Sequence, residues 1–145
     1  MILIDANLLI YAYHAGSPRH VASRAWFEDA LSGWDSIGLA WVTLWAFLRI
    51  VTHPKVFERP LTIDQAQAAV SSWIEQPNVA IVEPGDRHWE ILGHLVNHGQ
   101  ATGALMMDAA LAAIAVEHGA TLCTTDRDFT RFPGLKWMNP IAGSN

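Results

Sequence analysis

The feature of this chain that most constrains its fold is the stretch from Leu105 to Phe132. It begins with an alanine-rich run typical of a helix, passes a glycine, and continues into a short apolar strand, Ala120 to Cys123. Asp108 falls in the first turn of the helix, and Asp126 and Asp128 follow the strand. A strand that ends in carboxylates beside a helix that carries another is a candidate site for a divalent cation, and oxygen ligands suit Mg²⁺ or Mn²⁺.

The remaining sequence alternates short apolar strands with helices. Strands are expected over residues 1–4, 36–39, 79–82 and 120–123, with an edge strand over 135–138. Helices are expected over 6–14, 18–31, 41–51, 63–75 and 87–96, followed by a polar loop over 97–103, and the tail is expected to be loose. This alternation predicts an α/β fold with a mostly parallel sheet of four to five short strands flanked by helices, in a single domain over residues 1–145.

A further carboxylate follows the first predicted strand, at Asp5. In open parallel sheets the ligand site lies at the carboxyl ends of the strands. Asp5 and Asp126 therefore fall at the same edge of the sheet if the first and fourth strands are neighbours.

Each of these acids also has a purely structural explanation. Asp5 is suited to cap the helix that starts at residue 6, and Asp108 is favoured in a first turn by the helix dipole. Asp126 and Asp128 suit the cap and turn of the short segment that follows them. Together, however, they would repel one another and lose stability without a cation. A bound Mg²⁺ relieves this repulsion and assists phosphoryl transfer or phosphodiester hydrolysis, so the combination favours such a site.

Composition limits the setting and the partners. A chain of 145 residues that is 51% hydrophobic can form a core, and no apolar run reaches the roughly 18 residues of a membrane span. The N-terminus does not resemble a signal peptide, and the single Cys123 fits a reducing compartment, so a cytoplasmic protein is expected. With a net charge of −5, either nucleic acid is not the partner or it is held by a local basic patch and by metal ions.

Basic and aromatic side chains mark possible contact surfaces. The candidates for RNA contacts are Arg49, Lys55 and Arg127, with a solvated surface as the alternative. The seven tryptophans are interpreted as core and partner-interface residues rather than base-stacking residues. Trp26, Trp41 and Trp45 are the candidates for a partner surface, although core packing is the expected fate of most of them.

Four short motifs, taken in order, resemble a known family. They are Asp5-Ala6-Asn7 after the first strand, Phe47-Leu48-Arg49 in a helix, Asp108-Ala109 at the start of an alanine-rich helix, and Thr124-x-Asp126-x-Asp128-Phe129. Together they resemble the PIN-domain ribonucleases, and more narrowly the VapC-type toxins of bacterial type II toxin–antitoxin pairs. The resemblance extends from Met1 to about Pro140, and residues 126–135 are its most specific part.

This resemblance implies a PIN-like sandwich and a Mg²⁺- or Mn²⁺-dependent endoribonuclease that cuts structured RNA such as tRNA or ribosomal RNA. It also implies a cognate antitoxin and a homodimer. Asp5, Asp108 and Asp126 match the family's catalytic, metal-binding acids, and Asp128 matches a frequent additional metal ligand. Asn7 and Thr124 match polar residues that support these carboxylates through hydrogen bonds.

The sequence departs from the family at one position. Many members carry a Glu immediately before the Phe-Leu-Arg motif, where this chain has Ala46. One ligand fewer predicts one well-held ion, with any second ion bound mainly together with substrate phosphate. The departure also favours an alternative, a catalytically weak or inactive PIN-like module for RNA binding or assembly. A phosphoacceptor signalling domain is disfavoured, because neither Lys55 nor Lys136 follows a late strand.

Overall fold

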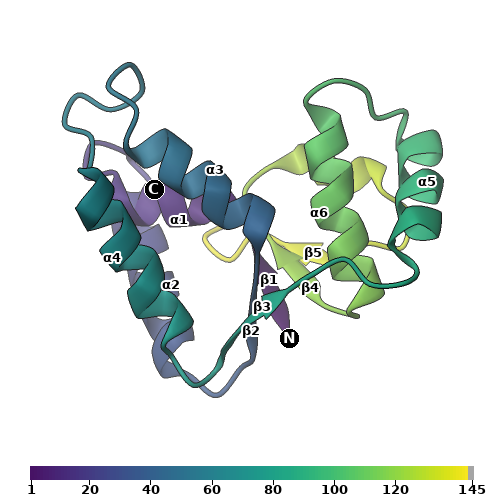
Figure 1. The fold of residues 1–145 in the computed structure, drawn as a ribbon, viewed down its shortest axis with the longest axis horizontal. Coiled ribbons are helices and arrows are strands. Elements are labelled where there is room, and N and C mark those ends of the chain that lie inside the picture. Colours follow the sequence, from purple (N-terminus) through teal and green to yellow (C-terminus); the bar gives the residue numbers. More distant parts are fainter. Residues whose placement is uncertain (144–145) are drawn as a thin grey trace.

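The computed structural model of the chain describes residues 1–143 and contains one five-stranded sheet (Figure 1). The strands lie in the order β3-β2-β1-β4-β5, and every neighbouring pair is parallel. Their bounds are β1 (Ile2–Ile4), β2 (Ile37–Ala40), β3 (Val79–Val82), β4 (Thr121–Cys123) and β5 (Trp137–Met138). The predicted α/β architecture with a parallel sheet is therefore confirmed, and β1 and β4 are neighbours.

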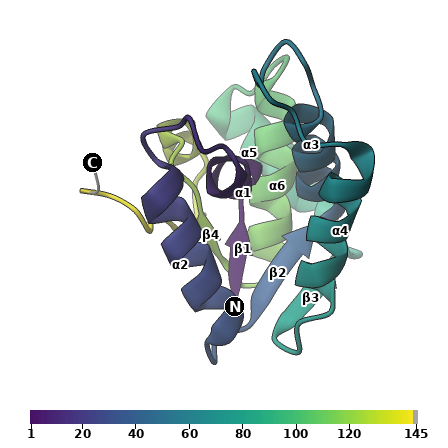
Figure 2. The ribbon, with the colours of Figure 1, turned by 90° about the vertical axis from the view of Figure 1, so that its left-hand side faces the viewer.

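Helices cover both faces of the sheet, as Figures 1 and 2 show. One layer contains α1 (Ala6–Tyr13), α2 (His20–Ser32), α3 (Trp41–Val51) and α4 (Ile63–Ile74). The other layer contains α5 (His88–Gly99) and α6 (Leu105–Glu117). A 3₁₀ helix, η1 (Arg127–Arg131), follows β4.

Successive strand residues pack into opposite layers. In β1, Leu3 joins the core under α5 and α6, whereas Ile4 joins the core under α1 to α4. In β4, Leu122 and Cys123 divide in the same way. A strand that is buried on both faces has no polar face, which explains why the strands read as continuous apolar runs in the sequence.

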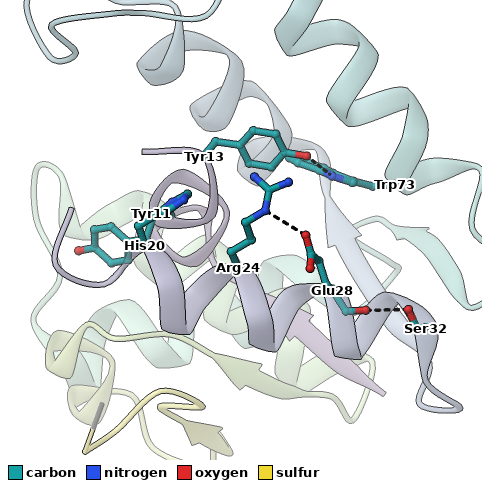
Figure 3. Close-up of polar contacts among 7 residues, drawn as sticks. All are labelled: Tyr11, Tyr13, His20, Arg24, Glu28, Ser32 and Trp73. Atoms are coloured by element: carbon teal, nitrogen blue, oxygen red, sulfur yellow. Dashed lines mark hydrogen bonds and ion pairs between the residues drawn. The ribbon is translucent and has the colours of Figure 1, made fainter. Parts of the chain in front are cut away.

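The larger core is centred on Trp73 of α4, which is 1% exposed. Its ring meets those of Tyr13, Phe27 and Phe47 edge to face, at centroid distances of 5.6, 5.3 and 4.7 Å. Its Nε1–H donates to the Tyr13 hydroxyl at 3.2 Å, and the Arg24 guanidinium lies over the Tyr13 ring (Figure 3). This contact ties α4 to α1, two helices that are distant in sequence.

The prediction that most of the partner-surface tryptophans pack in the core was wrong. Trp41 and Trp45 are exposed on α3, and Trp34 and Trp89 are exposed elsewhere. Trp26 is partly buried and packs against the larger core. The first turns of α3 therefore present aromatic rings to solvent beside the sheet edge.

Two boundaries also differ from the prediction. Residues 97–99 were expected to be in a loop but form the last turn of α5, which ends at Gln100 with a left-handed φ of 49°. A Cβ on Gly99 would lie 3.0 Å from the Phe132 ring, so this glycine permits close packing rather than a turn. Within the tail, Ile141 is buried against the larger core, which the prediction of a loose tail missed, and residues 144–145 lie outside the described part.

None of the helices within residues 1–143 combines the length and the apolar character needed to span a bilayer.

Candidate functional site

The candidate site lies along the carboxyl edge of the sheet. Because all five strands are parallel, the residue that follows each strand lies at this edge. In sheet order these residues are Glu83, Trp41, Asp5, Thr124 and Asn139. Two neighbouring pairs are hydrogen-bonded: Trp41 Nε1–H donates to Glu83 Oε1 at 3.2 Å, and Thr124 Oγ1–H donates to Asp5 Oδ2 at 2.7 Å. The edge is thus a continuous row of functional groups.

Asp5 is both the N-cap of α1 and a member of this row. Its Oδ1 accepts the backbone N–H of Ala6 at 2.7 Å, while its Oδ2 faces Thr124. Burial raises the pKa of Asp5, the hydrogen bonds from Thr124 and Ala6 oppose the rise, and the charge of Asp126 adds to it. The capping role is therefore present, but it does not account for a carboxylate that is held in an unfavourable environment.

Asp108 reaches the same edge from the first turn of α6. Burial, together with the charges of Asp5, Asp126 and Asp128, raises its pKa to about 6, and the charge of Arg131 opposes the rise. The structure therefore brings the four predicted acids near enough to one another to interact electrostatically.

Thr124 is the buried hub that connects the acids. Its Oγ1 donates to Asp5 and accepts the backbone N–H of Asp126 at 3.0 Å. Asp126 in turn caps η1, because its Oδ1 accepts the backbone N–H of Asp128 at 2.8 Å. Asn7 Nδ2 donates to Thr125 Oγ1 at 3.0 Å and more weakly to Thr124 Oγ1 at 3.4 Å. Asn7 thus reaches Asp5 through Thr124 rather than directly.

A small hollow of about 100 Å³ separates Asp5 from Asp108. Ala46 lines it, so the position where the family Glu was expected does face the acids. Thr43, one turn earlier on α3, also lines it. The Thr43 hydroxyl is buried without a hydrogen-bond partner among residues 1–143, as is Asn7 Oδ1. Sequence analysis missed Thr43, because a lone threonine in an apolar helix carries no signal except its spacing from Ala46.

The donor atoms around this hollow are oxygens, the ligands that hard cations such as Mg²⁺ prefer. Within residues 1–143, no three His, Cys, Asp or Glu side chains converge closely enough, as they stand, to hold an ion. Carboxylates that raise one another's pKa repel, and a cation between them would draw them together. The residues therefore fit a divalent cation in their chemistry, with side-chain movements needed to close around it.

The predicted RNA contacts differ in their position. Arg127 lines a hollow of about 480 Å³ beside the acids, together with Arg19, Thr125 and Asn139. Sequence analysis missed Arg19, whose guanidinium donates to the Tyr11 hydroxyl at 3.0 Å. The other two candidates lie elsewhere: Arg49 is exposed near the end of α3, and Lys55 lies in the loop beyond that end. The structure thus brings only Arg127 of the three beside the acids.

Comparison with known sequences gives a family and relatives of nearly equal length. The model of the PIN domain family matches residues 2–135. The chain is 42% identical over 142 residues to Ribonuclease VapC37 of Mycobacterium tuberculosis, covering 98% of this chain and 99% of the relative. It is 40% identical over 141 residues to Ribonuclease VapC33 of the same species, covering 97% and 99%.

Comparison with solved structures gives the same fold at low identity. VapBC2 from Rickettsia felis, bound to a DNA fragment from its promoter, includes a chain with a TM-score of 0.69 at 18% identity, covering 96% of this chain and 98% of that one. VapC20 of Mycobacterium tuberculosis, described as a sarcin–ricin loop cleaving toxin, has a TM-score of 0.65 at 17% identity, covering 94% and 99%. At these identities the likeness establishes the architecture.

Proposed function

The chain belongs to the PIN domain family, and from this premise we propose that it is a metal-dependent endoribonuclease, the toxin of a toxin–antitoxin pair. The main support is that Asp5, Asp108, Asp126 and Asp128 lie near enough to one another to interact, since burial together with the charges of the other three acids raises the pKa of Asp108 to about 6. Groups with perturbed pKa values in a hollow are candidates for catalysis. The names of relatives that match almost the whole chain point to the same activity.

The proposed catalytic residues are Asp5, Asp108 and Asp126, which would hold Mg²⁺ or Mn²⁺, with Asp128 as an additional ligand. Such an ion, when bound, lowers the pKa of water and neutralises charge that develops on a phosphoryl group. Thr124 holds Asp5 and the backbone of Asp126 in place, and Asn7 steadies Thr124 and Thr125. Since Ala46 supplies no oxygen, we propose one well-held ion, with any second ion bound mainly together with substrate phosphate.

The proposed reaction is hydrolysis of an RNA phosphodiester. A water oxygen forms a bond to phosphorus as the bond from phosphorus to the 3′ oxygen breaks, and the departing oxygen takes up a proton. The products carry a 5′-phosphate and a 3′-hydroxyl. Arg127 and Arg19 are placed to bind the backbone phosphates on one side of the acids. The substrate class proposed is structured RNA, tRNA or ribosomal RNA.

We further propose that residues 1–145 act as one domain, as a homodimer in the cytoplasm, and that a cognate antitoxin blocks the acids. The antitoxin is proposed because the solved structures that share this fold include a chain of a VapBC complex and a VapC toxin. The compartment is proposed because the single cysteine, Cys123, is a buried free thiol without an internal disulfide partner, which suits a reducing environment.

An RNA cleavage assay tests the activity. The purified chain, free of antitoxin, is incubated with total tRNA and ribosomal RNA, with Mg²⁺, with Mn²⁺ or with EDTA. Asp108→Asn is the test variant, and Asp29→Asn, an exposed acid of α2, is the matched control. Discrete metal-dependent fragments with 5′-phosphate ends, absent only for Asp108→Asn, are expected. Fragments ending in a 2′,3′-cyclic phosphate would contradict the reaction proposed.

Ala46 favours a second candidate, a catalytically weak module that binds RNA without cutting it. This second candidate predicts a folded chain that binds RNA and leaves every RNA intact with either metal. Gel-shift assays on the same RNA samples distinguish it from the nuclease.

A further inference from the structure

A third hollow, of about 400 Å³, lies beside the acids between α3, α6 and the end of β3. Its walls are mainly aromatic and apolar, with Trp41 and Trp45 from α3 and Met107 from α6. Trp45 is 63% exposed and Trp41 is 40% exposed, which is unusual for the largest apolar side chains. The hollow shares Val42 and Met107 with the depression that separates Asp5 from Asp108, so the two are contiguous.

Two polar groups line this aromatic hollow. The Nδ1 of His88 is buried and has no hydrogen-bond partner among residues 1–143. The Glu83 carboxylate accepts one hydrogen bond from Trp41, which leaves acceptor capacity free. His118 Nε2, 2.7 Å from the Glu83 carbonyl oxygen, fixes the backbone there. A mostly apolar hollow with a few polar atoms is typical of a site for a small, flat ligand.

We propose that this aromatic hollow binds an unstacked base of the RNA substrate next to the scissile phosphate. The proposal rests on the proposed ribonuclease function and names a specificity site for it. Unstacked RNA bases are held between aromatic side chains and recognised by hydrogen bonds to their edges. Trp41, the first residue of α3, directly follows β2, and Asp5 directly follows the neighbouring strand β1. A nucleotide joined to a phosphate at the acids therefore lies within reach of the aromatic hollow.

Charge indicates that a base, rather than the backbone, occupies this hollow. The edge of the sheet has the arginine-lined hollow at the β4–β5 end, the acids at β1, and the aromatic hollow at the β2–β3 end. Glu83 would repel a phosphate but accepts N–H groups. The arginines therefore suit the backbone on one side, and the tryptophans with Glu83 suit a base on the other.

The same chemistry selects among the four bases. Guanine offers two adjacent kinds of donor on its Watson–Crick edge, N1–H and the N2 amino group, whereas the other bases offer a single donor group there. A carboxylate such as that of Glu83 pairs best with adjacent donors. We infer a preference for guanine at a position next to the cut.

The test uses RNA hairpins with randomised loops, cleaved by the full chain and sequenced at the cut ends. The preferred hairpin is then remade with inosine, which lacks the N2 amino group, in place of guanosine. Values of kcat/KM are compared for wild type, Glu83→Gln, Trp45→Ala and Trp45→Phe. The matched control is Trp34→Ala, because Trp34 precedes β2 at the opposite edge of the sheet and is fully exposed.

Loss of one stacked base corresponds to a fall of roughly 5- to 150-fold in kcat/KM for Trp45→Ala, with Trp45→Phe retaining most of the rate. Inosine is expected to lower the rate of wild type but not that of Glu83→Gln. Two results would overturn the proposal. The first is that Trp45→Ala leaves the rate and the base preference unchanged. The second is that Trp45→Ala loses only self-association, measured by sedimentation, or only antitoxin binding. The latter would make this surface a protein interface.

A binding measurement separates this proposal from the proposed function. In EDTA, tryptophan fluorescence is followed during titration with the heptaribonucleotides UUUGUUU and UUUUUUU. If wild type cuts no RNA, the nuclease proposal fails. The base site is still supported if UUUGUUU quenches the fluorescence more strongly than UUUUUUU and if this difference disappears in Trp45→Phe. Equal quenching by both RNAs, or quenching unaffected by Trp45→Phe, overturns it.

Discussion

Thr124 Oγ1–H donates a 2.7 Å hydrogen bond to Asp5 Oδ2, which joins the residue after β4 to the residue after β1 across 119 positions of sequence. The same hydroxyl oxygen accepts the backbone N–H of Asp126. One buried side chain therefore fixes two of the proposed catalytic acids relative to each other.

We expect Thr124→Val, which keeps the shape but removes the hydroxyl, to lower the free energy of unfolding by about 1–3 kcal/mol, because buried partners lose their hydrogen bonds. The pKa of Asp5 should rise further, since the Thr124 hydrogen bond opposes its elevation. Urea unfolding and NMR titration of the carboxyl carbon measure the two effects. Thr124→Ser restores the donor and serves as the control; equal losses in both variants would contradict this role.

Asp108 should make the metal-free protein less stable as pH rises. Its pKa increases from 3.8 in the unfolded chain to about 6 in the folded chain, so the folded state binds more protons between these values. Its contribution to stability is full below pH 3.8 and is lost as pH rises through 6. In EDTA at pH 7.5, Asp108→Asn should melt a few degrees above wild type, and this advantage should vanish near pH 3.5. Asp29→Asn is the control, and a lower melting temperature for Asp108→Asn at pH 7.5 would refute the repulsion.

Glu117 holds the loop between β3 and α5. Its two carboxylate oxygens accept the backbone N–H groups of Gly85 at 2.7 Å and Arg87 at 3.0 Å, and the first of these bonds is the main cause that lowers its pKa. Glu117→Ala should speed hydrogen exchange at both amides, because each N–H loses its carboxylate acceptor. In wild type this protection is present above the ordinary pKa of Glu and is lost as pH falls through the lowered pKa.

Gly85→Ala should act through the same contact, because a Cβ there would lie 2.6 Å from Glu117 Oε2. We expect Gly85→Ala and Glu117→Ala together to speed exchange at Arg87 no more than either alone. Additive effects in this double-mutant cycle would mean that the two substitutions act on separate contacts.

Tyr13→Phe should lower the free energy of unfolding by about 0.5–1.5 kcal/mol, since the buried Trp73 N–H loses its acceptor while the ring contacts remain. Chemical denaturation measures this change. Tyr11→Phe is the matched control, because the Tyr11 hydroxyl accepts a hydrogen bond from Arg19 that is exposed to solvent. A loss in Tyr11→Phe as large as that in Tyr13→Phe would count against the role of the Trp73 contact.

Ala46→Glu should add a carboxylate to the hollow between Asp5 and Asp108. In the absence of metal, this variant should be less stable than wild type at neutral pH, because a further charge joins acids that already repel. With Mn²⁺ it should bind a second ion more tightly in calorimetric titration. Ala46→Gln has a side chain of similar size without the charge, so it separates the effect of charge from the effect of volume. Equal metal affinity in Ala46→Glu and Ala46→Gln would show that the missing Glu does not limit binding of the second ion.

The sequence was a good guide to the strands and to the acids for one physical reason. The central strands β1, β2 and β4 are buried on both faces and read as apolar runs, and a parallel sheet brings the ends of these runs to one edge. The order of apolar runs and carboxylates along the chain was therefore enough to place Asp5 and Asp126 at the same edge, provided that β1 and β4 pair, as they do.

The parts that sequence analysis missed depend on packing between distant elements. The aromatic hollow exists only because α3 and α6 approach each other across the sheet edge, which gives Trp45, Glu83 and His88 a common surface. Likewise, Gly99 resembles a helix terminator in the sequence, whereas in the structure it lies within the helix and packs closely against the Phe132 ring. Neither relationship leaves a local pattern of spacing or composition.

The order of the strands also has a consequence for synthesis of the protein. β1 is made first, at residues 2–4, yet its neighbour β4 comes at residues 121–123, and Asp126 follows it. A growing chain on the ribosome therefore carries Asp5 long before it can hold the Thr124 partner or the later acids. The proposed site therefore stays incomplete until β4 and the residues that follow it have been made and have folded against β1.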